Sequence, residues 1–181
     1  MKANNGISEH SKQSVADELS KILADEYVLS AKTEYAHWNV KSKDFYEKHK
    51  LFEAQYTRLD EIIDSLAERI RVSGHYAPGA LSSFLSLSRL SEMNREKNDS
   101  QGFIYELLMD HKSIIMNLRE NIQKFADKFH DIGSIDFITG LMEDHKKMAC
   151  FLRAHLLSAK KQIDKRSEVS KLKKQPTTVY I

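Results

Sequence analysis

The sequence contains little cysteine, proline or glycine, and these shortages exclude several classes of protein. Its 181 residues include one cysteine, two prolines and six glycines. The single cysteine, Cys150, rules out an intrachain disulfide framework and a cysteine-rich zinc site, and it fits a reducing compartment. Because helix-breaking residues are rare while Leu, Ala, Glu, Lys and Met are common, the composition favours an all-α protein.

Long apolar runs are also missing. None approaches the ~18 residues that a membrane span requires. No apolar stretch near the N-terminus resembles a secretory signal, so we expect a cytoplasmic protein with no membrane partner. Glycine-rich phosphate loops, CxxC pairs and nucleophile elbows are absent, which leaves nucleotide binding and serine hydrolysis without support.

The net charge of +2 hides an asymmetry along the chain. The segment 160–181 has two acidic residues and seven basic ones, so it carries +5 and the rest of the chain carries −3. The body is therefore expected to attract cations and the tail polyanions such as DNA. An equal alternative is that the tail is a solvated helix end that only keeps the protein soluble. Its basic residues are Lys160, Lys161, Lys165, Arg166, Lys171, Lys173 and Lys174.

Helical spacing of apolar residues predicts four long helices and one short one. The long helices cover about 14–37, 44–72, 99–126 and 134–159, and the short one lies between residues 78 and 90. This pattern describes a four-helix bundle with a long crossover between the second and third helices. We expect the bundle domain at 14–159, between an N-terminal tail at 1–13 and a basic C-terminal tail at 160–181.

Four potential metal ligands share one face of the second predicted helix. At ~100° per residue they lie at about 0°, 40°, 60° and 100° around the axis. Imidazole with carboxylate suits iron, manganese or zinc. Such a stripe is, however, more often simply a solvated face. The four residues are His49, Glu53, Asp64 and Glu68, and His37 adds a second imidazole at the end of the first helix.

Distances along that helix constrain any shared metal. His49 and Asp64 are separated by about 22 Å, and Glu53 and Asp64 by about 16 Å. Metal–ligand bonds are only ~2 Å long, so these groups cannot hold one ion within a single chain. If they share an ion, a second copy of the helix lies antiparallel across a two-fold axis. The metal hypothesis therefore predicts a homodimer.

An intrachain di-metal site is disfavoured. Such sites in helix bundles use a Glu-x-x-His motif on each of two helices. The sequence has this motif once, at Glu34 to His37.

Several stretches resemble the Dps family, the DNA-binding proteins from starved cells or mini-ferritins. The likeness spans about residues 15 to 158. The stretches are Thr33-Glu-Tyr-Ala-His-Trp-Asn-Val, His49-Lys-Leu-Phe-Glu-Ala-Gln-Tyr, Asp64-Ser-Leu-Ala-Glu-Arg-Ile, Asp136-Phe-Ile-Thr-Gly-Leu and Phe151-Leu-Arg-Ala-His.

The resemblance implies a hollow dodecamer of ferritin-like subunits that stores iron and protects DNA from oxidative damage. It implies a ferroxidase centre for two irons at each two-fold interface, with hydrogen peroxide as the preferred oxidant. His37, His49 and Glu53 would face Asp64 and Glu68 of the other subunit, and no catalytic group beyond these ligands is expected. Position 53 departs from the family, which usually has aspartate there. The alternative is a structural, DNA-compacting oligomer with a vestigial metal site, associated with the nucleoid.

The resemblance also suggests roles for three further residues. Trp38 would lie near the iron centre, although core packing is an equal alternative. Asp131 and Asp136 resemble residues that line a channel for incoming iron, and alternatively they are acids at a helix start. Of the other histidines, we expect a first group at the surface or an interface and a second in loops. The first is His111, His145 and His155, and the second is His10, His75 and His130.

Overall fold

The structure is a computed structural model that describes residues 6–92, 95 and 97–172, with side chains described as far as Leu156. Within these residues the chain forms helices and no strand. In order they are α1 (Glu9–Asn39), α2 (Phe45–Val72), α3 (Leu81–Leu87), α4 (Ser100–Lys124), a π-helical turn η1 (Phe125–Phe129) and α5 (Ile132–Leu172). The predicted all-α bundle with a short helix in the crossover is confirmed.

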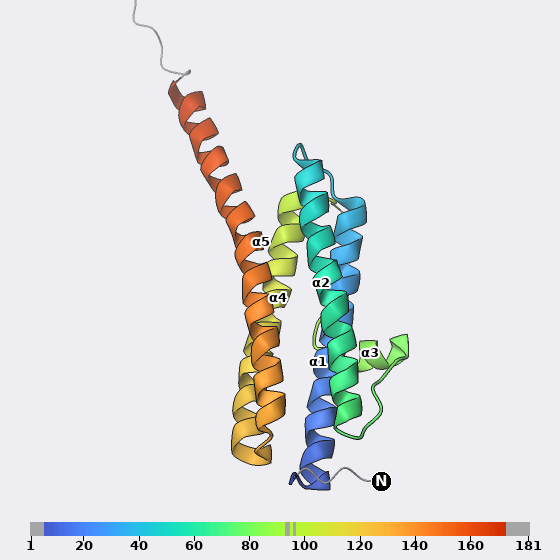
Figure 1. The fold of residues 1–181 in the computed structure, drawn as a ribbon. Coiled ribbons are helices and arrows are strands. Elements are labelled where there is room, and N and C mark those ends of the chain that lie inside the picture. Colours follow the sequence, from blue (N-terminus) through green and yellow to red (C-terminus); the bar gives the residue numbers. More distant parts are fainter. Residues whose placement is uncertain (1–5, 93–94, 96, 173–181) are drawn as a thin grey trace, which may run out of the picture.

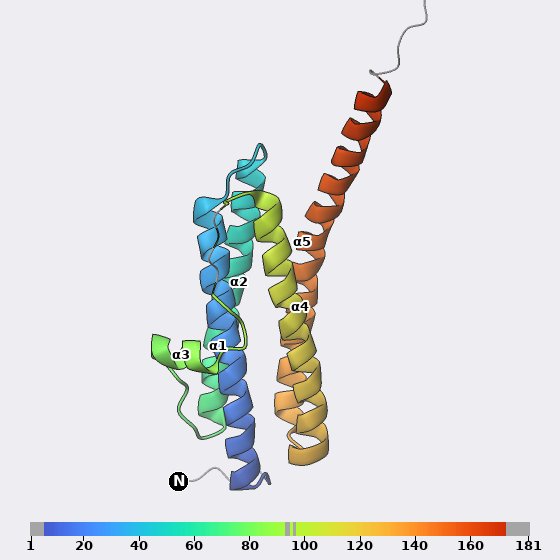
Figure 2. The ribbon, with the colours of Figure 1, turned by 180° about the vertical axis from the view of Figure 1, so that it is seen from behind.

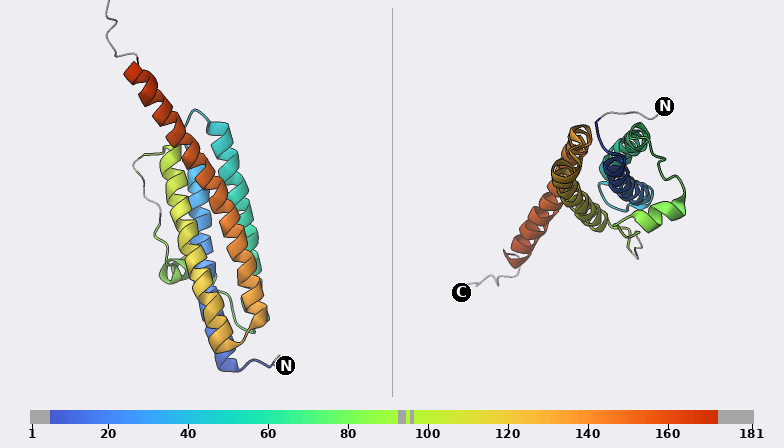
Figure 3. Two further views of the ribbon diagram at one scale, coloured as in Figure 1. Left: turned by 90° about the vertical axis from the view of Figure 1, so that its left-hand side faces the viewer. Right: turned by 90° about the horizontal axis from the view of Figure 1, so that it is seen from below.

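The four long helices form two antiparallel hairpins that pack side by side. Figures 1 and 2 show α1 beside α2 and α4 beside α5. The crossover runs along the outside and carries α3, which packs against α1 on the flank opposite α5 (Figures 1 and 3). The last turns of α5 continue past the ends of the other helices.

Local capping sets several helix ends. Ser8 accepts a hydrogen bond from the backbone N–H of Ser11, at 3.1 Å, and α1 therefore begins at Glu9 rather than at residue 14. Asp99 likewise caps α4 by accepting from the N–H of Gly102 at 2.8 Å. After α2, Gly74 adopts a φ of +94°, a left-handed conformation that glycine tolerates best. α5 runs to Leu172, beyond the expected end at residue 159.

The core is an apolar layer between the hairpins. Phe52, Phe103 and Phe125 are fully buried, among leucines and isoleucines from all four long helices. Burial of one such side chain contributes about 1.5–3 kcal/mol, so the layer dominates the favourable free energy of folding. Several polar side chains are buried as well, among them His37 at 8% exposure and His111 and His145 at 0%.

The crossover is anchored to α1 by ion pairs with low exposure. Asp25 is 1% exposed and accepts hydrogen bonds from the backbone N–H of Arg89 at 2.6 Å and from its Nε at 2.9 Å. Lys32, also buried, contacts Asp110 of α4 at 2.6 Å and donates to the carbonyl of Ser91. These contacts hold α3 on the outer face of α1.

Candidate metal centre

The predicted stripe lies on one uninterrupted helix. α2 runs from Phe45 to Val72 without a break, so the spacing assumed from the sequence applies. Asp64 and Glu68 are exposed, and His49 lies about 22 Å along the axis from Asp64. Among the described residues of one chain, no three histidine, cysteine or acidic side chains converge to hold a metal ion. The chain alone thus presents two separate parts of the expected ligand set.

His37 and His49 form the first part. His37 lies near the end of α1 and His49 on the second turn of α2, and the intervening turn brings their rings into a stack with centroids 3.7 Å apart. The Nδ1 of His37 is 2.9 Å from the carbonyl oxygen of His49, and the Nδ1 of His49 is 3.0 Å from that of His37.

These reciprocal contacts fix the tautomers of both rings. A carbonyl oxygen only accepts, so each Nδ1 must carry the proton that it donates. Each neutral imidazole then keeps the lone pair on Nε2, the arrangement that a metal-ligating histidine requires. The two rings are therefore oriented as ligands by the backbone alone.

Glu53 lies one turn after His49 and is half-buried. The Nζ of Lys50 lies 2.6 Å from its Oε2. This hydrogen bond, with the charge of Lys50 and smaller effects of His37 and His49, lowers the pKa of Glu53. The carboxylate is thus an anion at neutral pH, beside the two imidazoles.

Aromatic side chains surround the two histidines. Phe45 stacks on His49 with ring centroids 5.1 Å apart, and the edge of Tyr56 meets His37 at 5.3 Å. Trp38 is 65% exposed, so it does not pack in the core of this chain. Whether this exposed ring lies near a bound metal stays a prediction.

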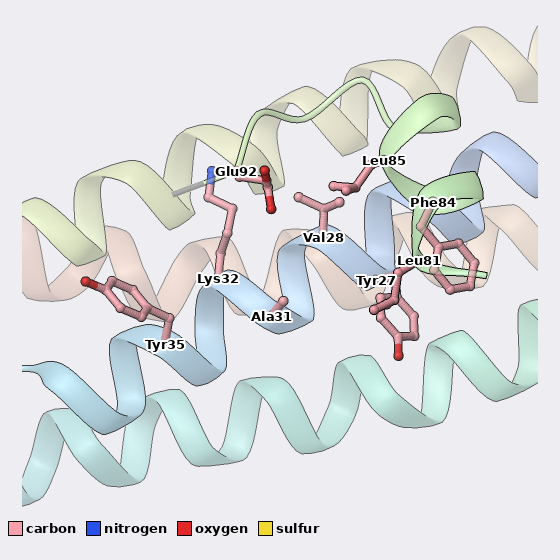
Figure 4. Close-up of a pocket in the computed structure, with 9 residues that line it drawn as sticks. All are labelled: Tyr27, Val28, Ala31, Lys32, Tyr35, Leu81, Phe84, Leu85 and Glu92. Atoms are coloured by element: carbon pink, nitrogen blue, oxygen red, sulfur yellow. The ribbon is translucent and has the colours of Figure 1, made fainter. Parts of the chain in front are cut away.

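Asp64 and Glu34 belong to a groove on the outer face between α1 and α2. The groove encloses about 310 Å³, and its floor includes the small side chains Ser30, Ala31 and Ala67. A second groove, of about 280 Å³, adjoins it on the other side of α1, against α3. Figure 4 shows its apolar end. That end is formed by Tyr27, Leu81 and Phe84, with Tyr27 stacked on Phe84 at 4.3 Å.

The first of the two predicted channel aspartates has a structural role. Asp131 caps α5, accepting from the backbone N–H of Ser134 at 3.1 Å and from its hydroxyl at 2.6 Å. Arg69 lies 3.8 Å away. The helix-start interpretation of Asp131 is therefore confirmed. Asp136 is exposed on α5, and whether either residue lines a channel stays a prediction.

Two histidines expected at the surface are instead in the core. His111 of α4 and His145 of α5 are both 0% exposed, as is Glu26 of α1. The expectation was wrong, although a signal existed: both histidines occupy the helical spacing of buried leucines and isoleucines on their helices. His155 is half-buried. His10 also differs from expectation, because α1 starts early enough to include it.

The remaining loop assignments hold, and part of the C-terminal prediction falls outside what the structure describes. His75 and His130 lie in loops, as predicted. The side chains of the basic segment 160–181 lie outside the described residues. No helix in the described part of the chain is both long and apolar enough to cross a membrane.

Comparison with known proteins shows which families this bundle resembles. A family model for the ferritin-like domain matches residues 16–161. The chain is 39% identical over 153 residues to an uncharacterized low temperature-induced protein of Nostoc, covering 84% of this chain and 86% of the relative. It is 32% identical over 138 residues to the DNA protection during starvation protein of Helicobacter pylori, covering 76% and 95%.

Solved structures agree. The Dps protein of Vibrio cholerae, described as one of the ferritin-like diiron-carboxylate proteins, has a TM-score of 0.79 at 26% identity, covering 86% of this chain and 98% of that one. Dps of Mycobacterium smegmatis has a TM-score of 0.80 at 26% identity, covering 86% and 94%. The chain belongs to the Dps family of ferritin-like proteins. The resemblance seen in the sequence is thereby confirmed, and this Dps chain has the ferritin-like fold that it implied.

Proposed function

We propose that this Dps chain is a ferroxidase whose iron sites are each shared by two subunits. The observation that carries the proposal is the stacked His37–His49 pair. In this pair the backbone carbonyls accept from both Nδ1–H groups, which leaves both Nε2 lone pairs available to a metal ion. Imidazole together with carboxylate suits ferrous iron. His37, His49 and Glu53 of one subunit would bind iron with Asp64 and Glu68 of its mate.

The exposed faces of α1 and α2 support the sharing. Asp64 lines a groove with small residues such as Ala31 and Ala67, and small residues allow close approach of another helix. The adjoining groove against α3 carries large exposed apolar side chains, with Leu81 at 66% and Leu85 at 54% exposure. Apolar surface of this kind is typical of an interface. An antiparallel second copy on this face would bring its Asp64 toward the His37–His49 pair.

The reaction balances with ferrous iron as substrate and hydrogen peroxide as oxidant. Two ferrous ions each give one electron, and the peroxide takes both electrons and two protons to leave two waters and two ferric ions. The chain's contribution is to hold two ions close together with open positions for the oxidant. The carboxylates offset the cationic charge of the substrate, and the fixed tautomers avoid a reorganisation of the rings before binding.

Storage and DNA protection follow from the same activity. We infer that ferric product collects inside a closed shell of twelve subunits in the cytoplasm, and that removal of iron together with peroxide prevents hydroxyl-radical damage. Light scattering on the eluted peak should give twelve times the mass of the 20.9-kDa chain. A monomer at micromolar concentration would contradict both the shell and the shared site.

The activity test removes the imidazoles. In a His37→Ala, His49→Ala variant, peroxide consumption with ferrous iron should fall by at least ~100-fold, because both neutral ligands are lost. The matched control is His10→Ala with His75→Ala, which removes two histidines that make no part of the site. Unchanged kinetics in the first variant would contradict the proposal.

A second candidate function is DNA binding, and the charge of +5 on segment 160–181 favours it. Repeated around an oligomer, such tails bind phosphates cooperatively without reading sequence. Retention of DNA in a gel should weaken steeply with rising salt and be lost in a chain that ends at Ala159. Retention of DNA by the shortened chain would show that the tail is not the DNA-binding segment. A chain that binds DNA yet shows no ferroxidase activity would favour the structural alternative.

A further inference from the structure

Three buried titratable side chains form a hydrogen-bonded chain through the core, and the proposed function does not use them. The Nε2 of His145 lies 2.9 Å from Oε1 of Glu26, and its Nδ1 lies 2.9 Å from Nδ1 of His111. We call these residues the buried His–Glu cluster. It links α1 of the first hairpin to α4 and α5 of the second, at a depth where all three residues are 0% exposed.

The buried His–Glu cluster ends in one polar atom on each side. Among the described residues, neither Oε2 of Glu26 nor Nε2 of His111 has a hydrogen-bond partner, although both atoms are buried. A buried polar atom without a partner is held at a cost of about 1–3 kcal/mol in stability. The cluster therefore has no second acceptor near His111 to stabilise an added positive charge.

Proton counting shows what acid does to this arrangement. His145 donates from Nε2 to the carboxylate of Glu26, and one proton is shared between the two facing Nδ1 atoms. Because His145 uses its one proton on Nε2, its Nδ1 accepts from the Nδ1–H of His111, and a further proton on His111 can go only to Nε2, which has no partner among the described residues. Burial, and then the charge of His145, lower the pKa of His111 well below its ordinary value.

The other charged groups near the cluster are already engaged. Asp110, next to His111 on α4, contacts Lys32 of α1 at 2.6 Å. On α2, Lys48 pairs with Asp44 and His155. The buried side chains in the middle of this helix are apolar except Gln55, an uncharged amide that donates to the carbonyl of Met148 on α5. The groups that act on His111 are thus His145 of α5 and, through it, Glu26 of α1.

We propose that the buried His–Glu cluster is an acid-sensitive device that holds the two hairpins together when His111 is neutral and releases them when it is protonated. Its state would decide whether the α4–α5 hairpin stays packed on the α1–α2 hairpin, which carries every candidate iron ligand. The sign follows from linkage: the pKa of His111 is lower in the folded state, so its contribution to stability is present above about pH 6.5 and lost as the pH falls.

Urea unfolding between pH 7 and pH 5, at fixed protein concentration, tests the device. For the wild type, the unfolding equilibrium constant should rise with acid more steeply than for His111→Leu, with a difference that approaches about tenfold per pH unit below pH 6, because the variant takes up one fewer proton on unfolding. The control, His10→Leu, removes an exposed histidine and should keep the wild-type slope. Equal slopes for wild type and His111→Leu would overturn the proposal.

A measurement on the wild type stands even if His111→Leu fails to fold. Hydrogen exchange, corrected for its intrinsic pH dependence, should show α4 and α5 losing protection between pH 7 and pH 5.5 before α1 and α2 do. Uniform protection across the four helices through this range would contradict the device. Neither experiment contains iron, so its outcome is independent of the proposed ferroxidase activity.

Discussion

Histidine and acidic residues occur together in two regions of this Dps chain, the outer face of the α1–α2 hairpin and the core between the two hairpins. The two regions hold these residues in opposite ways. On the α1–α2 hairpin, Glu53, Asp64 and Glu68 reach the outer face, where a second subunit can complete a site. Between the hairpins, Glu26, His111 and His145 are sealed in the core. The residue types are the same, but the acids of the first region are open to solvent at least in part, whereas Glu26 is not.

The largest expected effect comes from removing one carboxylate from each region. Glu26→Ala leaves the buried Nε2–H of His145 without its acceptor and should lower the free energy of unfolding by about 1–3 kcal/mol. Glu53→Ala, at the surface beside Lys50, should leave the urea midpoint unchanged within error. Similar midpoints for the two variants would break the comparison.

A second prediction concerns the candidate iron ligands on the outer face of α2. Asp64→Asn with Glu68→Gln removes the acids that one subunit offers its mate, so peroxide-dependent iron oxidation should fall by at least ~tenfold. The urea midpoint should not move, because both side chains are exposed. Glu120→Gln, which removes an exposed acid of α4 outside the groove, is the control and should keep full activity.

The smallest effect is expected at His155, which lies between the two extremes. Lys48 donates to its Nδ1 at 3.0 Å, and burial, followed by the charge of Lys48, lowers its pKa. Its contribution to stability is therefore also lost as the pH falls. Because the ring is only half-buried, His155→Gln should reduce the acid slope by much less than the tenfold per pH unit expected of His111→Leu. A larger change at His155 than at His111 would contradict the ranking by burial.

Much of the fold could be predicted from the sequence because it depends on local signals. Apolar spacing and the rarity of helix breakers predicted the four long helices and the crossover. The end of α5 was missed, since the expected boundary followed the end of the apolar pattern while the helix continues to Leu172. The predicted unbroken length of α2 was also enough to show that His49 and Glu53 cannot share an ion with Asp64 of the same chain.

The finer features of both regions depend on tertiary contacts. The stripe on the second helix predicted His49 as a candidate ligand, with His37 as a second imidazole, but the turn between α1 and α2 decides that the Nδ1 of each ring donates to the other residue's carbonyl. His111 and His145 were expected at the surface or at an interface. In the core each satisfies part of the other's hydrogen bonding, and Glu26 completes that of His145, which outweighs their polarity.

Mixing two inactive variants tests the shared site most directly. One lacks the imidazoles (His37→Ala, His49→Ala) and the other the partner acids (Asp64→Asn, Glu68→Gln). After co-refolding at equal amounts, half of the dimers are mixed and each mixed dimer has one intact site, so about a quarter of wild-type ferroxidase activity should return. A mixture that stays as inactive as its components would contradict a site built from two subunits.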